Sequence, residues 1–184
     1  MTNIQHVTDF NKILKSMFPE DVWDDTSLHT AGRFLKYLDE FFPKTELDFN
    51  FTTFKAAHAQ MIMVRDIEFS SICCHHLLPF FGKVHIGYIS NRIEVGVSKL
   101  PRLVDWCARR PHTQEKLTSQ ICHELKERLQ AQGVYVIIES VHTCMSCRGV
   151  RKVGASMVTS LPQGQFLTSP PARAEFLELL RSGK

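Results

Sequence analysis

The chain has 184 residues, of which 43% are hydrophobic and 22% charged, a composition typical of a soluble globular protein. A formal net charge of +3 argues against nucleic acid or a membrane surface as a partner, and no apolar run reaches the roughly 18 residues of a membrane-spanning helix. The first residues lack the basic and then apolar pattern of a secretory signal, so we expect a cytoplasmic protein whose six cysteines stay reduced.

No internal repeat, low-complexity tract or linker interrupts the chain, so we expect a single structural domain overall. Two apolar stripes predict helices in an N-terminal helical region, 1–44. The remaining region, 45–184, begins with a strand-like segment over 47–69.

Two alternating runs, 84–88 and 93–97, flank a short polar turn and predict a β-hairpin. Leucine and isoleucine recur every four residues from Leu117 to Leu129, and Gly133 is the expected C-cap of that helix. Similar patterns predict further helices at 98–110 and 172–180 and strands at 134–139 and 150–160. Together these elements predict an α+β fold, an antiparallel sheet with two central helices packed on one face.

The first motif that carries chemistry is the run Cys73-Cys74-His75-His76. A Cys and a His three residues apart can face one ion across a turn, and thiolate with imidazole suits zinc better than magnesium or calcium. The alternative is a reduced cysteine pair in the core beside two surface histidines. A metal site is the better interpretation because four cysteine and histidine residues stand in a row.

A second motif, His142-Thr143-Cys144-Met145-Ser146-Cys147-Arg148-Gly149, follows the strand predicted at 134–139. On an extended segment His142 and Cys144 would share a face, because side chains two apart point the same way. Two metal sites are then possible. A set of Cys73, His76, Cys144 and Cys147 would be closed and structural, whereas three protein ligands plus water would be catalytic.

Two weaker features could bind an anion and a nucleobase. Ser98, Lys99 and Arg102 cluster at a predicted helix start, where backbone N–H groups and the helix dipole favour an anion. The same residues could form an ordinary solvated helix face. Gln114-Glu115 opens the next helix, and a carboxylate beside an amide can pair with the N–H donors of guanine or can be a favourable first-turn charge.

These features occur in one order, and in that order the chain resembles the GTP cyclohydrolase I family. The resemblance runs from about Phe51 to the end and is densest from Ser71 to Ser160. Its most specific stretches are Cys73 to Ile86, Ser98 to Arg102, Gln114 to Thr118 and Cys144 to Val150.

The resemblance implies the T-fold and a toroidal oligomer, usually a decamer of two pentamers, with active sites at subunit interfaces. It implies one Zn²⁺ ion held by Cys73, His76 and Cys144, with His75 and His142 as acid and base. The substrate, a purine nucleotide, would be bound by Gln114 and Glu115 at the guanine and by Ser98, Lys99, Arg102 and Arg148 at the ribose and triphosphate. The implied reaction opens the imidazole ring of GTP at C8, releasing formate and 7,8-dihydroneopterin triphosphate for tetrahydrofolate biosynthesis.

The chain departs from the family pattern in three places. Cys74 stands where the family has Glu, and Ser146-Cys147 replace a Met pair. His29 and Gly32 stand where a phosphate-binding Arg and Lys are expected. The alternatives to a GTP cyclohydrolase are therefore a paralogue with the same zinc chemistry on another purine nucleotide and an inactive, zinc-stabilised assembly protein.

Overall fold

The computed structural model describes residues 3–19, 29–41 and 50–182. The chain divides into two compact units, Met1–Glu46 and Leu47–Lys184, and each is considered by itself. In the first unit, helices α1 (Ile4–Met17) and α2 (Thr30–Phe41) pack through aromatic side chains, with the rings of Phe10 and Phe34 5.5 Å apart. The helices predicted for this region are confirmed in its described part.

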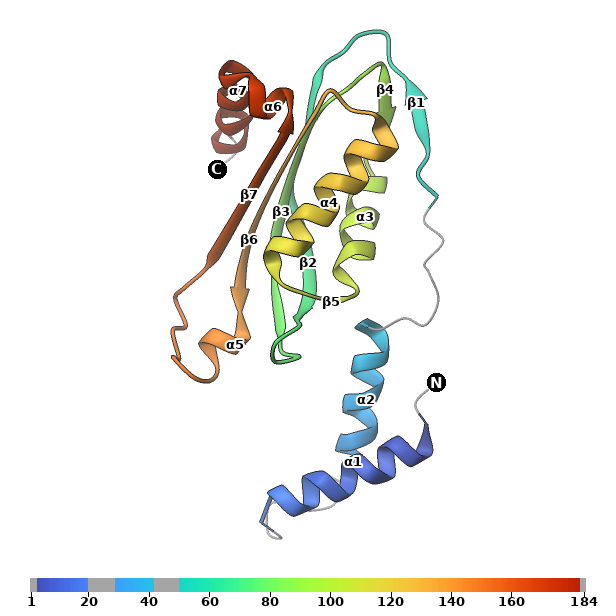
Figure 1. Cartoon of the computed structure of the whole chain (residues 1–184), viewed down its shortest axis with the longest axis vertical. Coiled ribbons are helices and arrows are strands. Elements are labelled where there is room, and N and C mark those ends of the chain that lie inside the picture. Colours follow the sequence, from blue (N-terminus) through green and yellow to red (C-terminus); the bar gives the residue numbers. More distant parts are fainter. Residues whose placement is uncertain (1–2, 20–28, 42–49, 183–184) are drawn as a thin grey trace. The chain divides into compact units, whose positions relative to one another are not determined.

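The second unit is built on a five-stranded sheet of order β5-β2-β3-β6-β7, accompanied by a separate pair of strands, β1 and β4 (Figure 1). Neighbouring strands of the large sheet are antiparallel except β2 and β5, which are parallel. The strands are β1 (Thr53–Lys55), β2 (Met61–Cys73), β3 (Pro79–Ile89), β4 (Ile93–Val95), β5 (Pro111–His112), β6 (Gly133–His142) and β7 (Met157–Gly164). The helices are α3 (Lys99–Ala108), α4 (Gln114–Leu129), α5 (Thr143–Ser146), α6 (Gln165–Thr168) and α7 (Pro170–Arg181).

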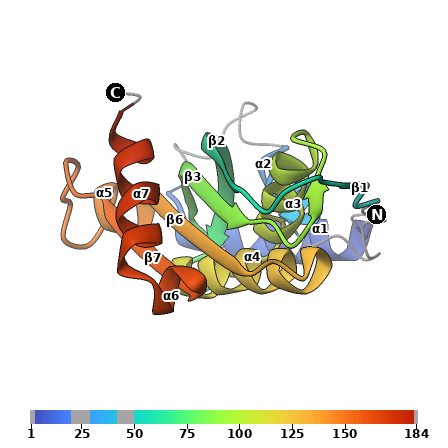
Figure 2. The same cartoon turned by 90° about the horizontal axis from the view of Figure 1, so that it is seen from above.

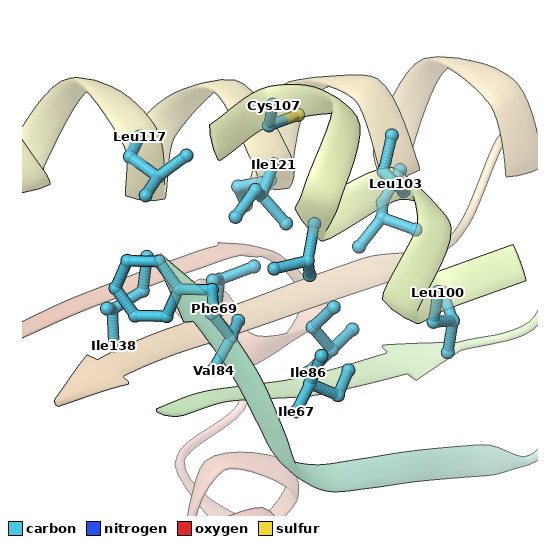
Figure 3. Packing of buried hydrophobic residues seen from close by; sticks show 14 of the residues in the cluster. Ile67, Phe69, Val84, Ile86, Leu100, Leu103, Cys107, Leu117, Ile121 and Ile138 are labelled. Atoms are coloured by element: carbon cyan, nitrogen blue, oxygen red, sulfur yellow. The ribbon is translucent and has the colours of Figure 1, made fainter. Parts of the chain in front are cut away.

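Helices α3 and α4 cover one face of the sheet, as predicted. Val134, Val136 and Ile138 alternate along β6 and join the same buried cluster as the inward faces of both helices, because side chains two apart on a strand share a face. Figure 3 shows this cluster, in which sheet residues such as Phe69 and Ile86 point toward Leu103, Cys107, Leu117 and Ile121. Burial raises the pKa of both Cys107 and Cys122 to about 12, so these two thiols stay protonated and belong to the core.

The opposite face of the sheet is covered near one end by α6 and α7 (Figure 2). The helix predicted at 172–180 is confirmed as α7, but its position on this face was not predicted. Tyr135 and Ile137, which alternate with the residues above, pack there against Phe166 and Phe176. A side chain at Gly87 of β3 would meet the ring of Phe176, so the glycine allows α7 to approach the strand. Both faces of β6 are therefore buried.

The predicted hairpin between 84–88 and 93–97 is wrong. β3 pairs along its length with β2 on one side and with β6 on the other, so neither of its edges is free. Strand β4 pairs with β1 instead, and the backbone N–H of Val95 on β4 donates to the hydroxyl oxygen of Tyr88 on β3 at 3.3 Å.

The predicted C-cap of α4 is also wrong. The residue in the left-handed conformation is Gln130, with φ 46° and ψ 38°, and Gly133 is already the first residue of β6. Gly133 avoids a close contact there, because a Cβ at this position would lie 3.1 Å from the backbone nitrogen of Gln165. In the part of the chain that the structure describes, no helix is long and apolar enough to cross a membrane.

Candidate metal centre

The turn between β2 and β3 brings Cys73 and His76 together. The Cys73 N–H donates to the carbonyl of Leu78 at 2.9 Å, and the Leu77 N–H donates to the carbonyl of Cys73 at 2.9 Å. Leu77 has a positive φ of 54°, which closes the turn. The two hydrogen bonds hold the intervening residues in a tight loop, so residues three apart can face the same side, as the sequence spacing predicted.

Cys144 reaches this turn from the end of β6. The prediction that His142 and Cys144 lie on one extended segment is wrong, because the chain turns into the short helix α5 directly after His142. The Thr143 hydroxyl donates to the carbonyl of Pro79 at 2.6 Å and ties the start of α5 to the start of β3. Figure 1 shows α5 and the β2–β3 turn at the same end of the sheet.

One sulfur or ring-nitrogen atom each from Cys73, His76 and Cys144 lie within 4.8 Å of one another. Burial, and then the neighbouring Cys73 thiolate, raise the pKa of Cys144, and a cation bound between the two sulfurs would oppose both effects. Cys147 is exposed and does not belong to this group. Two thiols and one imidazole form a ligand set that fits a soft or borderline metal ion.

Two further histidines lie beside the group. His75 is exposed, and its Nδ1 lies 3.7 Å from the sulfur of Cys73. His142 stacks on the buried ring of Phe80, with centroids 4.6 Å apart and planes 4° from parallel. Burial lowers the pKa of His142, and the negative charge of Glu115 acts in the opposite direction. The effect of Glu115 indicates that its carboxylate lies near the imidazole.

Gln114 and Glu115 differ in burial at the start of α4, where Thr113 caps the helix by accepting from the Lys116 N–H. Glu115 is exposed, whereas Gln114 is buried and its side-chain amide is hydrogen-bonded to β6 and β7. The two residues that the sequence placed together at the guanine thus have very different surroundings.

His112 is a residue near the metal group that the sequence analysis missed. It pairs with Cys73 in the parallel β2–β5 ladder, and its carbonyl accepts from the Cys74 N–H at 3.1 Å. Its ring Nε2 lies 2.9 Å from the carbonyl of Cys107, at the end of α3, and burial lowers its pKa. The buried ring therefore links the ligand-bearing turn to α3, and no pattern in the sequence signals this role.

The predicted phosphate ligands are divided between two places. Arg148 follows α5, and its positive charge opposes the raised pKa of Cys144, which indicates that it lies near that thiol. Ser98, Lys99 and Arg102 lie at the start of α3, whose far end leads into β5 beside Cys73. This ten-residue helix rises about 15 Å, so Ser98 and Lys99 lie at the end of α3 that is farther from the metal group, and Arg102 lies about one turn along the helix from them.

A family model described as GTP cyclohydrolase I matches residues 7–181, a region that contains every candidate site residue named above. The chain belongs to the GTP cyclohydrolase I family. A protein of Sulfurihydrogenibium sp. named GTP cyclohydrolase 1 is 40% identical over 97% of this chain and 98% of its own length. Family membership thus extends through both units of the chain.

Two further relatives carry the same name. The protein of Thermobifida fusca is 53% identical over 70% of this chain, in a match that spans 63% of its own length. The protein of Campylobacter jejuni is 48% identical over 73% of this chain and 71% of its own. Among solved structures, the apo form of the archaeosine synthase QueF-Like covers 60% of this chain and 97% of its own at 17% identity, with a TM-score of 0.43 that is too low to support a conclusion.

Proposed function

We propose that this chain is a zinc-dependent GTP cyclohydrolase I. It would open the imidazole ring of GTP at C8, release formate and form 7,8-dihydroneopterin triphosphate, the first step of pteridine and tetrahydrofolate biosynthesis. The observation that carries the proposal is the meeting of Cys73, His76 and Cys144 beside His142, in a chain of this family. The names of the relatives support GTP as the substrate.

Zinc suits the two thiols and one imidazole of the candidate site. When bound, it supplies Lewis acidity that lowers the pKa of a water molecule toward neutrality. Because Cys147 lies outside the group, three protein ligands leave one coordination position for water, which is the pattern of catalytic rather than structural zinc sites.

The residues around this group supply binding and proton transfer. C8 of the purine lies between two nitrogens and is electron-poor, so water adds there, and opening the ring requires N7 and N9 to be protonated in turn. His142 and His75 would exchange those protons as acid and base. The exposed carboxylate of Glu115, near His142, would accept hydrogen bonds from the N–H donors of guanine.

The triphosphate would be bound by Arg148 together with Ser98, Lys99 and Arg102. Because these last three lie at the other end of α3 from the metal group, we propose that they complete the site of a neighbouring subunit. We propose that the chain has the T-fold and assembles into the toroid of the family, a decamer in the cytoplasm. The separation supports an active site that uses residues from more than one chain.

One observation favours a second candidate, a paralogue that acts on a purine nucleotide with fewer phosphates. His29 and Gly32 stand where the family has a phosphate-binding Arg and Lys. The two candidates share the metal group, and they differ in how strongly the enzyme prefers three phosphates.

The test is to incubate the zinc-loaded protein with GTP, GDP and GMP and to measure formate and the fluorescence of the oxidised pterin. The proposal predicts equal amounts of formate and pterin from GTP. It also predicts that His142→Ala keeps its zinc and loses turnover by about 10²-fold or more. Turnover of GDP or GMP but not GTP would favour the paralogue, and formate from none of the three would refute both candidates.

A further inference from the structure

We propose that Gln114 is a positioning residue that determines which ring nitrogen of His142 carries the proton, rather than a residue that binds guanine. The inference rests on the proposed function, because it refines the role of His142 there. It starts from the hydrogen bonds of the Gln114 side chain, which is only 1% exposed.

The orientation of the Gln114 amide follows from its neighbours. Its Nε2 lies 3.0 Å from the carbonyl oxygen of Ile138, 3.2 Å from that of Met157 and 3.0 Å from the hydroxyl oxygen of Thr159. Carbonyl oxygens only accept hydrogen bonds, so the amide must turn its NH₂ group toward them. The opposite orientation would place the amide oxygen against these three oxygens in a buried site, with a desolvated acceptor left unpaired.

The hydroxyl groups nearby agree with this orientation. The Thr118 hydroxyl donates to the backbone carbonyl of Gln114 at 2.8 Å, so Thr159, 2.7 Å away, must donate its own proton to Thr118. The Thr159 oxygen then turns a lone pair toward Gln114 and accepts from its NH₂ group.

The oxygen of the amide must therefore accept from the other side. Oε1 of Gln114 lies 2.6 Å from the Ser140 hydroxyl and 2.9 Å from Nε2 of His142. An amide oxygen carries no proton, so Nε2 of His142 is the donor and is protonated. A neutral His142 then has its lone pair on Nδ1, which makes no hydrogen bond to any residue in the described ranges.

Two consequences follow for the reaction. Phe80 covers one face of the His142 ring and Gln114 holds one edge, so Nδ1 is the ring atom left to exchange a proton with substrate. Guanine could bind Gln114 only by displacing one of these hydrogen bonds, because both amide protons and both oxygen lone pairs are in use. The adjacent Glu115, which is exposed, is the residue placed to contact a base.

The first test measures the tautomer directly. Solid-state ¹⁵N NMR of the zinc-loaded protein, with ring-labelled histidine and a His142→Gln sample to assign the signal, reports which nitrogen carries the proton. We expect neutral His142 to be protonated at Nε2. Protonation at Nδ1 would overturn the inference, and the measurement needs neither substrate nor turnover.

The second test separates positioning from binding. Gln114→Met keeps the length of the side chain but removes the acceptor, so we expect a mixture of His142 tautomers, a kcat lowered by about 10-fold to 100-fold and a KM for GTP within about 3-fold. Ser140→Ala is the control for the tautomer, which it should leave unchanged because Gln114 still accepts from His142.

A Gln114→Met enzyme whose KM rises while kcat and the His142 tautomer stay the same would contradict the inference and restore the base-binding role. Failure of the wild-type protein to act on GTP would instead refute the proposed function, and the NMR result would still decide the tautomer. The two failures are therefore distinguishable.

Discussion

Cys144 and Cys147 lie three positions apart in the sequence, but their thiols have different surroundings. Cys144 lies at the β2–β3 turn with Cys73 and His76, whereas Cys147 ends α5 and is exposed. We expect Cys144→Ala, Cys73→Ala and His76→Ala each to lose bound zinc, because two protein ligands do not hold the ion.

Elemental analysis of the purified variants measures the zinc content per chain. Cys147→Ala is the matched control and should retain one zinc ion, since its sulfur lies outside the group. Loss of zinc from the Cys147 variant would mean that the site is closed and structural, which would contradict the proposed catalytic role.

The residues at the expected phosphate positions predict weak discrimination among nucleotides. A hydrogen bond to a charged group contributes roughly 1.5–3 kcal/mol, so two missing cations raise the KM for GTP by about 10²-fold or more. His29→Arg with Gly32→Lys should lower the KM for GTP more than that for GDP, with little change in kcat. Among the described residues, a Cβ at Gly32 would contact only Val7, 3.9 Å away, so the described part of the chain leaves room for the first carbon of a lysine side chain.

Steady-state kinetics of the wild type and of the double variant on both nucleotides test this expectation. The buried ring of His112 cannot replace a missing cation, since it is bonded to the carbonyl of Cys107. A wild-type enzyme with a micromolar KM for GTP and no activity on GDP would show that other cations bind the triphosphate.

At the scale of elements, the contact between β3 and α7 depends on Gly87. Gly87→Ala would place a methyl group against the fully buried ring of Phe176, which we expect to cost about 1–3 kcal/mol of unfolding free energy. The midpoint of thermal unfolding, followed by circular dichroism, should fall by several degrees.

Gly154→Ala serves as the control, because no atom of the described chain lies within 4 Å of the added Cβ and the backbone there has no positive φ. Its unfolding midpoint should match that of the wild type. Equal midpoints for all three proteins would mean that α7 does not pack on β3 as described.

Local patterns predicted the elements better than their partners. The alternation after Val84 correctly indicated a strand, but a strand's partner depends on which edges are free, and both edges of β3 are taken by β2 and β6. The position of α6 and α7 could not be predicted from the sequence either, because the pattern of a short amphipathic helix does not indicate which face of a sheet the helix will cover.

The residues of the candidate site also differ in how well the sequence predicted their surroundings. Cys73 and His76 are three residues apart, so spacing alone suggested that they share an ion. The residues also suggested Cys144 as a ligand, but only the family resemblance favoured a set with Cys144 and without Cys147. The surroundings of Gln114 could not be predicted, because its partners on β6 and β7 lie 24 to 45 residues further along the chain.

For the whole molecule, the separation of the metal group from the cations at the start of α3 predicts complementation. By the proposed roles, a His142→Ala chain would lack a catalytic base, and a Lys99→Ala/Arg102→Ala chain would lack phosphate ligands. Suppose that each site takes His142 from one subunit and Lys99 and Arg102 from its neighbour. A ring assembled at random from equal amounts of the two variants then has both sets of residues intact at about one quarter of its sites. Co-expression should therefore recover activity that neither variant has alone.

Sedimentation of the same samples shows whether activity travels with an assembly. Activity absent from the mixed rings would mean that both sets of residues serve one subunit. A stable monomer of 21.1 kDa that turns over substrate would also contradict the shared site.

We propose above that this chain opens the guanine ring of GTP at C8. The most direct measurement is ¹³C NMR of a reaction with [8-¹³C]GTP and the zinc-loaded wild-type protein. The account predicts that the label appears in free formate in the same amount as 7,8-dihydroneopterin triphosphate is formed, and that Cys144→Ala releases none. Label that stays in the nucleotide, or that remains bound in the pterin product, would contradict the account.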